Sequence, residues 1–265
     1  AGGDIAEMYR TAKAGDYDYG RRFWANEYRL NAKISEYPKP YVAFMHGFTL
    51  GGGVGVSCHG SHRVVCETTR IGMPECGIGL TPDVGGSWLL SRAPGRLGEY
   101  LGTTGARMNA MDAIHAGFAD YFVPSEDWGA LIATLETGGA CGVIADAAQD
   151  TGLSNLAEMR AEIDFLFASD RLSDLRAALA QSQTPFARSA TERLARVSPL
   201  AAGTTLELLK QVRRVDDVRE ALSLEYRATW RSAEDGDFVE GIRAAIIDRD
   251  QKPVWRFQDF GDITP

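Results

Sequence analysis

The first half of the chain alternates short apolar runs with polar segments and glycine stops. Residues 41–47, 63–66 and 70–73 are apolar runs too short for helices and are bounded by Gly or Pro, so they predict buried strands. Two helices are expected before them. The first begins after a capping Asp4, and the second covers residues 20–36 and ends before Pro38.

The pattern changes after Pro124. Ala, Leu, Glu and Arg recur at helical spacing across residues 126–235, with few strand-like runs. Ser198-Pro199 has the capping residue and first-turn proline of a helix start. Two more helices are predicted over 217–230 and 238–248, two over 88–120, and a loop over 138–148. The chain therefore divides into an α/β region, residues 1–125, and a helical region, residues 126–265.

Composition narrows the class of protein. The 265 residues are 45% hydrophobic, which is enough for a full core. A net charge of −8 argues against a nucleic-acid binder, but a small anion could still bind in a local pocket. No apolar run approaches the ~20 residues that cross a bilayer, so no membrane partner is expected. Four scattered cysteines without a C-x-x-C pair indicate a reduced, intracellular protein.

A run of three glycines provides the first chemical feature. Gly51-Gly52-Gly53 follows a predicted strand and precedes a segment of small residues that we expect to be helical. Backbone N–H groups at such a helix start can bind a negatively charged oxygen. A flexible turn with no ligand is the alternative interpretation. The run is neither a phosphate-binding loop nor a dinucleotide fingerprint, because the flanking residues and spacing do not fit.

Two carboxylates in one glycine-rich loop form the second feature. Glu75 and Asp83 each follow a proline, and apolar and glycine residues surround them. Partial burial would raise the pKa of such an acid toward that of a useful general base. Asp83 could instead cap the next helix. The four histidines lack the spacing of a metal site, so no metal is expected, and no Gly-x-Ser-x-Gly elbow is present.

Several motifs together give a family resemblance. Their combination resembles the crotonase (enoyl-CoA hydratase/isomerase) superfamily, and more narrowly its 3-hydroxyisobutyryl-CoA hydrolase branch, over nearly the whole chain. The resemblance implies a β-β-α superhelical core followed by a helical region. The motifs that carry it are Ala1-Gly2-Gly3-Asp4-Ile5, Lys39-Pro40-Tyr41-Val42-Ala43, His46-Gly47, Gly51-Gly52-Gly53, Ser57-Cys58-His59-Gly60, Met73-Pro74-Glu75, Pro82-Asp83-Val84-Gly85-Gly86, Gly117-Phe118-Ala119-Asp120 and Glu240-Gly241-Ile242-Arg243-Ala244.

The resemblance also implies roles for particular residues. Backbone N–H groups of Gly3 and Gly52 would hold the thioester carbonyl of an acyl-CoA, as an oxyanion hole. Gly55 stands where the hydratases carry their first glutamate, which argues against hydration. Glu75 and Asp83 match the acid pair of the hydrolase branch and would be catalytic and substrate-binding. Glu27 would bind the hydroxyacyl end, with an exposed helix glutamate as the alternative.

The expected reaction is hydrolysis of 3-hydroxyisobutyryl-CoA, an intermediate of valine breakdown, to 3-hydroxyisobutyrate and CoA. Another crotonase reaction, such as enoyl-CoA hydration or isomerisation, and a non-catalytic acyl-CoA-binding relative are the alternatives. No metal or redox cofactor is implied. Superfamily members usually trimerise, and the oligomeric state here stays open.

Two further expectations concern the whole protein. The Ala- and Arg-rich composition suggests a bacterial cytoplasmic protein, with the mitochondrial matrix as the alternative for a eukaryotic source. The chain starts inside a turn that the family places after an N-terminal strand-helix-strand segment of core strands. We therefore expect the N-terminal strands to be missing from the sequence, and the whole protein to have about 350 residues.

Overall fold

The strands form two small parallel sheets. The structure is a computed structural model that describes residues 2–150 and 152–258. One sheet has the order β1-β3-β5 and the other pairs β2 with β4. The strands are β1 (Val42–Met45), β2 (Phe48–Leu50), β3 (His62–Val65), β4 (Arg70–Gly72) and β5 (Tyr121–Phe122).

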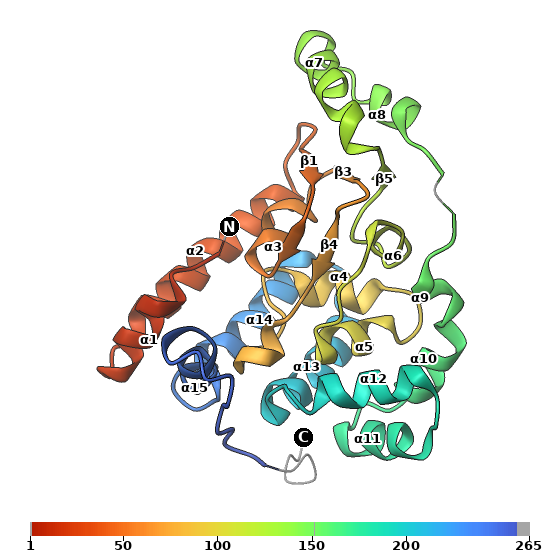
Figure 1. Ribbon diagram of the computed structural model, residues 1–265. Coiled ribbons are helices and arrows are strands. Elements are labelled where there is room, and N and C mark those ends of the chain that lie inside the picture. Colours follow the sequence, from red (N-terminus) through yellow and green to blue (C-terminus); the bar gives the residue numbers. More distant parts are fainter. Residues whose placement is uncertain (1, 151, 259–265) are drawn as a thin grey trace.

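The chain passes alternately from one sheet to the other. β1 and β2 are consecutive but belong to different sheets, and Gly47 turns the corner between them with a φ of 59°. β3 and β4 repeat this step, so Val42 pairs with His62 and Phe48 with Arg70. Each strand-strand step thus adds one strand to each sheet, and this gives the predicted β-β-α superhelix (Figure 1).

Helices make up most of the rest. The 3₁₀ helix η1 (Glu75–Ile78) and the π-helical turn η3 (Arg243–Ile247) accompany them. The helices are α1 (Ile5–Lys13), α2 (Asp18–Ser35), α3 (Gly52–Ser57), α4 (Gly86–Arg92), α5 (Leu97–Thr104), α6 (Ala110–His115), α7 (Trp128–Gly138), α8 (Gly142–Ala147), α9 (Asn155–Glu158), α10 (Arg160–Leu166), α11 (Leu172–Gln181), α12 (Pro185–Leu194), α13 (Pro199–Val212), α14 (Val218–Ser232) and α15 (Phe238–Ile242).

Predicted helix starts are confirmed where a capping side chain was recognised. The Asp4 side chain accepts from the Glu7 N–H, and Ser198 accepts from the Ala201 N–H ahead of Pro199. Two predictions are wrong. Residues 88–120 lie in three helices, because Asn109 forms a capping box that starts α6. The segment 138–148, expected to be a loop, contains α8, because the left-handed Gly139 ends α7 and the chain then resumes a helix.

One core spans both regions of the chain. Leu90 and Leu97 of α4 and α5 belong to the same buried cluster as Leu206 and Leu209 of α13, which packs on both helices. Every described strand precedes residue 125, and the described elements beyond it are helices and their connections. The division into regions 1–125 and 126–265 stays a prediction.

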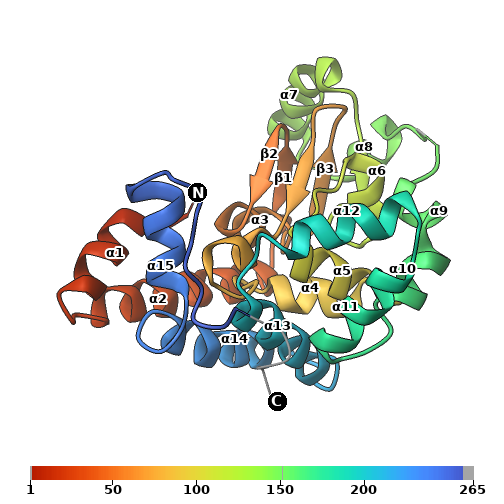
Figure 2. The same ribbon diagram turned by 60° about the horizontal axis from the view of Figure 1, so that its bottom comes forward.

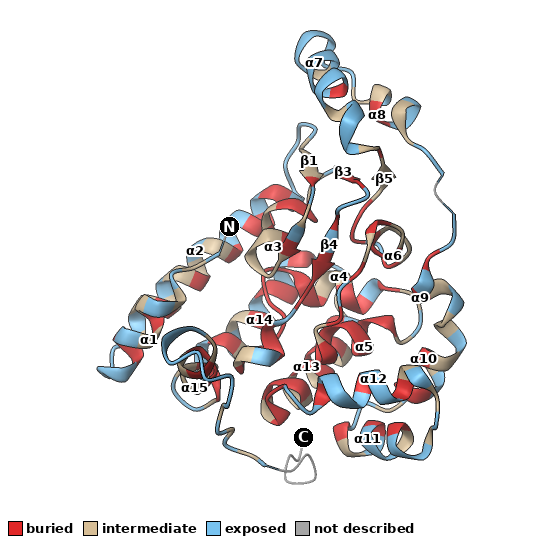
Figure 3. Cartoon of the chain, viewed as in Figure 1, coloured by how far each residue is buried: buried red, intermediate tan, exposed pale blue. Residues whose placement is uncertain are grey.

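The helices from the end of the chain return to the beginning. α14 packs along α2, and α15 packs against α1, as Figures 1 and 2 show. α7 and α8 project from the far side and are mostly exposed, over a small second cluster that includes Val64 and Ile144 (Figure 3). None of the described helices combines the length and apolar character of a membrane span. The α2–α14 pair is the part that matters for the site, because both helices face the loop that carries Asp83.

Candidate active site

The glycine turn lies where β2 ends and α3 begins. Gly51 has a φ of 52°, in the left-handed region that favours glycine. A Cβ atom at Gly51 would lie 2.7 Å from Oε1 of Glu75, and one at Gly52 would lie 3.0 Å from Oε1 of Glu27. The turn is therefore enclosed by two of the predicted acids, and side chains at these two positions would collide with them.

The N-terminal glycines lie against the same turn. A Cβ at Gly52 would also lie 3.0 Å from Cα of Gly2, so the two backbones are in close contact. Gly3 follows directly and packs against Phe23 and Met8. The structure thus brings the segment that carries Gly3 to Gly52. The assignment of their two N–H groups as an oxyanion hole stays a prediction.

Glu75 begins η1 and is buried, with 6% of its surface exposed. Its Oε2 atom has no hydrogen-bond partner among the described residues. Burial, together with the nearby Asp83 carboxylate, raises the pKa of Glu75 well above its ordinary value. A carboxyl whose pKa is raised is a stronger base in its ionised form than an exposed glutamate.

Asp83 is also buried, and it faces α2. The Tyr28 hydroxyl donates to its Oδ2 at 2.7 Å and is itself 3.3 Å from the Thr229 hydroxyl of α14. Burial raises the pKa of Asp83 to about 6, although the bond from Tyr28 lowers it. The alternative that Asp83 caps the next helix is wrong, because α4 starts after Gly85 and has no side-chain cap.

Glu27 lies on the inner face of α2, one residue before Tyr28. Its side chain is partly buried rather than exposed on a helix surface. Burial raises the pKa of Glu27 to about 7, and the charge of Asp83 acts in the same direction. Glu27, Glu75 and Asp83 therefore form one group of interacting carboxyls around the glycine turn.

The turn after Asp83 is strained and held from two sides. Val84 has a φ of 56° and Gly85 a φ of 77°, and a positive φ is unusual for a β-branched residue such as Val84. The buried His59 imidazole lies 2.8 Å from the Val84 carbonyl, and burial lowers the pKa of His59, which favours the neutral ring. Nε2–H of His59 then donates to that carbonyl.

The second support comes from α14. The buried Glu225 carboxylate accepts from the Gly85 N–H at 2.8 Å, from the Ser87 N–H at 2.9 Å and from the Ser87 hydroxyl. Burial raises the pKa of Glu225 to about 8, whereas these hydrogen bonds lower it. The sequence gives no sign of the supporting roles of Tyr28 and Glu225, and His59 stands out there only as part of the motif Ser57-Cys58-His59-Gly60. Glu225 lies far from Asp83 in sequence, and no local pattern links the two residues.

Gly55, which the family resemblance places where the hydratases carry a glutamate, lies in a crowded part of α3. A Cβ atom there would lie 2.6 Å from Nδ2 of Asn31 and 2.7 Å from Cβ of Val84. Real Cβ contacts are essentially never that short, so a side chain at Gly55 would force Asn31 or Val84 to move. The space beside α3 is taken by neighbouring side chains.

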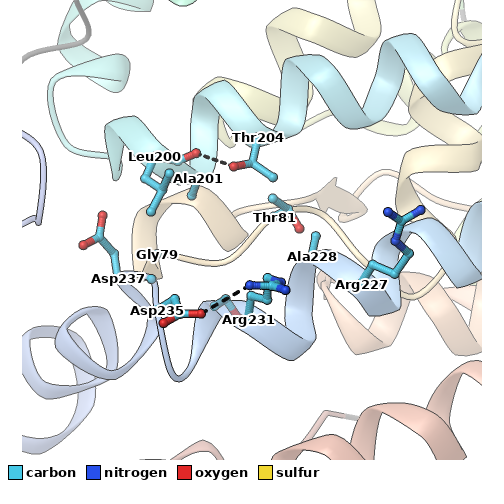
Figure 4. Close-up of a pocket in the computed structure, with 12 residues that line it drawn as sticks. Gly79, Thr81, Leu200, Ala201, Thr204, Arg227, Ala228, Arg231, Asp235 and Asp237 are labelled. Atoms are coloured by element: carbon cyan, nitrogen blue, oxygen red, sulfur yellow. Dashed lines mark hydrogen bonds and ion pairs between the residues drawn. The ribbon is translucent and has the colours of Figure 1, made fainter. Parts of the chain in front are cut away.

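We call the loop of residues 75–83, which carries Glu75 and Asp83, the acidic loop. A cavity of about 260 Å³ lies between α13, α14 and the segment Gly79–Thr81 of this loop (Figure 4). Its lining includes Thr81, Arg227 and Arg231, but none of the predicted acids. Across the described ranges, no group of three or more His, Cys, Asp or Glu residues could hold a metal ion.

Comparisons with known proteins agree with this architecture. A family profile described as Enoyl-CoA hydratase/isomerase matches residues 1–265. A zebrafish (Danio rerio) protein named "3-hydroxyisobutyryl-CoA hydrolase, mitochondrial" is 37% identical, over 97% of this chain and 69% of its own. The rat (Rattus norvegicus) protein of the same name is also 37% identical, over 100% of this chain and 71% of its own.

Solved structures are similar in fold and sequence. A structure described as an enoyl-CoA hydratase from Rhodobacter sphaeroides 2.4.1 has a TM-score of 0.95 and 52% identity, covering 100% of this chain and 77% of its own. One described as a carnitinyl-CoA dehydratase from Mycobacterium thermoresistibile has a TM-score of 0.94 and 44% identity, covering 100% and 76%. The chain therefore has the crotonase fold and belongs to the enoyl-CoA hydratase/isomerase family, in the branch whose curated members are named 3-hydroxyisobutyryl-CoA hydrolases.

Proposed function

We propose that this protein hydrolyses the thioester of a short 3-hydroxyacyl-CoA. The first candidate substrate is 3-hydroxyisobutyryl-CoA, with 3-hydroxyisobutyrate and CoA as products, as the names of the curated relatives suggest. The observation that carries the proposal is the pairing of buried Glu75 and Asp83 beside the glycine turn, together with the closed space at Gly55.

The mechanism begins at the thioester carbonyl. The N–H groups of Gly3 and Gly52 hold the carbonyl oxygen, and each such donor stabilises the developing oxyanion by about 3 kcal/mol. Glu75 in its ionised form then either attacks the carbonyl carbon or removes a proton from a water that attacks it. The C–S bond breaks, and the sulfur leaves as a thiolate. Where Glu75 is the nucleophile, the resulting acyl–Glu75 anhydride is hydrolysed by water in a second step, which releases the acid and restores the Glu75 carboxylate.

Asp83 completes the proton transfers. With a pKa of about 6, Asp83 exists in both protonation states near neutral pH, so it can orient the water or pass a proton to the departing sulfur. The balance is one thioester and one water giving one carboxylic acid and one thiol. Every step in this scheme uses protein groups and water, and no metal or redox cofactor takes part.

Hydration of an enoyl-CoA is the second candidate, because similar solved structures are described as a hydratase and a dehydratase. Hydration in this superfamily uses two glutamates, as the resemblance implies. Here only Glu75 is in place, since Gly55 leaves no room for a side chain. A non-catalytic acyl-CoA binder is the third candidate, and the intact Glu75 and Asp83 argue against it.

One product assay separates these candidates. The full-length protein is incubated with 3-hydroxyisobutyryl-CoA, 3-hydroxypropionyl-CoA and crotonyl-CoA, while free thiol and enoyl absorbance are followed together. Thiol release supports the hydrolase, loss of enoyl absorbance without thiol supports the hydratase, and binding without either supports the third candidate. Glu75→Gln should lower thiol release at least about 100-fold. Near-normal turnover by this variant contradicts the mechanism.

Isotope labelling tests the nucleophilic role of Glu75. During a single turnover in ¹⁸O-labelled water, an acyl–Glu75 anhydride that water opens at the Glu75 carbon leaves the label in the Glu75 carboxyl group. A general-base Glu75 leaves the label in the product acid alone, as does an anhydride opened at the acyl carbon, so only label in Glu75 identifies it as the nucleophile.

The proposal extends to compartment and assembly. The zebrafish and rat relatives carry "mitochondrial" in their names. We infer that the reaction takes place in the matrix where the source is eukaryotic and in the cytoplasm where it is bacterial. The proposed binding partner is an acyl-CoA substrate. A homo-oligomer is proposed because members of the superfamily usually form one.

A further inference from the structure

The two glycines of the proposed oxyanion hole come from segments that lie far apart in the chain. Gly3 precedes α1, and Gly52 begins α3. Among the described residues, no backbone hydrogen bond joins residues 2–4 to residues 51–53. Both glycines lie against side chains instead, so side-chain packing must set the distance between their two N–H groups.

One face of α2 contacts both glycines. Phe23 and Glu27 are four residues apart on this helix, which places them one above the other. Glu27 is the residue whose Oε1 lies 3.0 Å from a Cβ built on Gly52. Phe23 makes the corresponding contact with Gly3, because its Cζ and Cε1 atoms lie 2.9 Å and 3.0 Å from a Cβ built there. α1 and α3 also pack against α2, so this helix joins the two halves of the proposed hole.

The Phe23 ring is the rigid part of the contact at Gly3. The other close neighbour is Cε of Met8, at 3.0 Å, and a methionine side chain is flexible and moves aside easily. A benzene ring has no internal torsion, and Phe23 is partly buried against the main core cluster. The edge of this ring lies directly against the Gly3 backbone, in the space that a side chain would take.

We propose that Phe23 is a positioning residue that holds the Gly3 N–H at the distance from Gly52 that the thioester carbonyl needs. This inference rests on the proposed function and deepens it. Phe23 carries no polar group, so it acts through the Gly3 backbone. Donors stabilise an oxyanion only when they are aimed at the place that the oxygen takes, and a misplacement of about 1 Å can cost about 100-fold in rate.

Phe23→Leu removes the ring atoms that contact Gly3 and keeps an apolar side chain. With the full-length protein and 3-hydroxyisobutyryl-CoA, kcat should fall by about 10- to 100-fold while KM changes by less than about threefold, because the oxyanion exists only in the transition state. Phe186→Leu is the matched control. Phe186 is also partly buried against the same core cluster, where it contacts Tyr100 of α5, and this variant should keep the wild-type kcat.

An exchange of side-chain sizes tests the contact itself. Gly3→Ala places a methyl group 2.9 Å from Cζ of Phe23, so this variant should lose at least about 10-fold in kcat. Phe23→Leu removes that neighbour, so the double variant Gly3→Ala/Phe23→Leu should have a higher kcat than Gly3→Ala. Combining Gly3→Ala with Phe186→Leu should give no recovery.

The carbonyl stretching band of a bound thioester reports on the two N–H donors directly, because a hydrogen bond to the oxygen weakens the C=O bond and lowers its frequency. In the Glu75→Gln background, which slows hydrolysis, a ¹³C-labelled thioester carbonyl should absorb at a lower frequency than in solution. Adding Phe23→Leu should move the band back toward the solution frequency, and adding Phe186→Leu should not. Phe23→Met, which also lacks a ring, replaces Phe23→Leu where that variant does not fold.

An unchanged carbonyl band on adding Phe23→Leu would overturn the inference, because Phe23 would then only support the fold. Additive losses in the double variant with Gly3→Ala would overturn it as well. Release of CoA from none of the thioesters by the wild type contradicts the proposed function instead. In that case the carbonyl band, measured with Glu75 in place, still decides whether Phe23 holds the Gly3 N–H.

Discussion

The Tyr28 hydroxyl donates a hydrogen bond of 2.7 Å to Oδ2 of Asp83. The bond joins α2 to the acidic loop, and both side chains are buried. It opposes the effect of burial, because a donor stabilises the ionised carboxylate. Tyr28 therefore keeps the pKa of Asp83 lower than burial alone would make it.

Removing this bond should change the pH dependence of the reaction. In Tyr28→Phe the pKa of Asp83 rises above its present value of about 6, so the acidic limb of kcat/KM should move to higher pH. We expect about a tenfold loss at pH 6 and a smaller loss at pH 8. Profiles between pH 5 and pH 9 measure this. Tyr226→Phe, which changes the neighbouring ring without touching Asp83, should keep the wild-type profile.

The crowding at Gly55 predicts that alanine substitutions at Gly55 and Gly53, both in α3, will have different effects on stability. Gly55→Ala places a Cβ about 2.6 Å from Nδ2 of Asn31, so the variant should lose about 1–3 kcal/mol of stability by overpacking and most of its thiol-releasing activity. Gly53→Ala in the same helix meets only ordinary contact, with Thr49 at 3.6 Å. It should melt at or above the wild-type temperature. Equal melting temperatures for the two variants would show that Gly55 is not crowded.

The candidate residues of the acidic loop could be recognised in the sequence because their immediate neighbours in the chain distinguish them. Glu75 and Asp83 stand out in sequence by their apolar and glycine surroundings, and the turn at Gly52 by its glycine run. The structure brings Glu75 and Asp83 close enough for their charges to interact. Gly52 and Glu27 are in contact with each other. The structure thus brings Glu27, Gly52, Glu75 and Asp83 together, and their roles stay predictions.

The supporting residues follow from long-range packing instead. Glu225 contacts Gly85 and Ser87 only because α14 returns to the first half of the chain, and α14 alone shows an ordinary amphipathic pattern. The strands β2 and β5 have three and two residues, too few to show a period of two. Their pairing partners, rather than their own sequences, make them strands.

Glu27 should make the folded state sensitive to pH. Its pKa is about 7 when folded, above its ordinary value of 4.5, so between these values the folded protein binds more protons than the unfolded chain. Stability must therefore fall as pH rises from about 4.5 to about 7. Glu27→Gln should raise stability at pH 8 by on the order of 1–2 kcal/mol, allowing for solvent screening, with little change at pH 4.

Thermal melting at the two pH values checks this prediction. Glu136→Gln, on the exposed side of α7, removes a carboxyl from a solvated position and should change neither melting temperature. If Glu27→Gln melts lower than the wild type at pH 8, then the Glu27 carboxylate stabilises the fold. In that case the free-energy cost of burying the charged Glu27 side chain is smaller than the favourable interactions of its carboxylate.

We expect Glu225 to be a positioning residue for Asp83, through its hydrogen bonds to the backbone N–H groups of Gly85 and Ser87. Glu225→Leu leaves the buried N–H groups of Gly85 and Ser87 without an acceptor, at a cost of about 1–3 kcal/mol each, and frees the turn that follows Asp83. We expect a lower melting temperature and a fall in kcat that exceeds the change in KM. Glu225→Gln keeps one acceptor oxygen and should recover part of both. Glu220→Gln, an exposed change on the same helix, should leave them unchanged. A Glu225→Leu variant with normal kcat would mean that the turn holds its shape without α14.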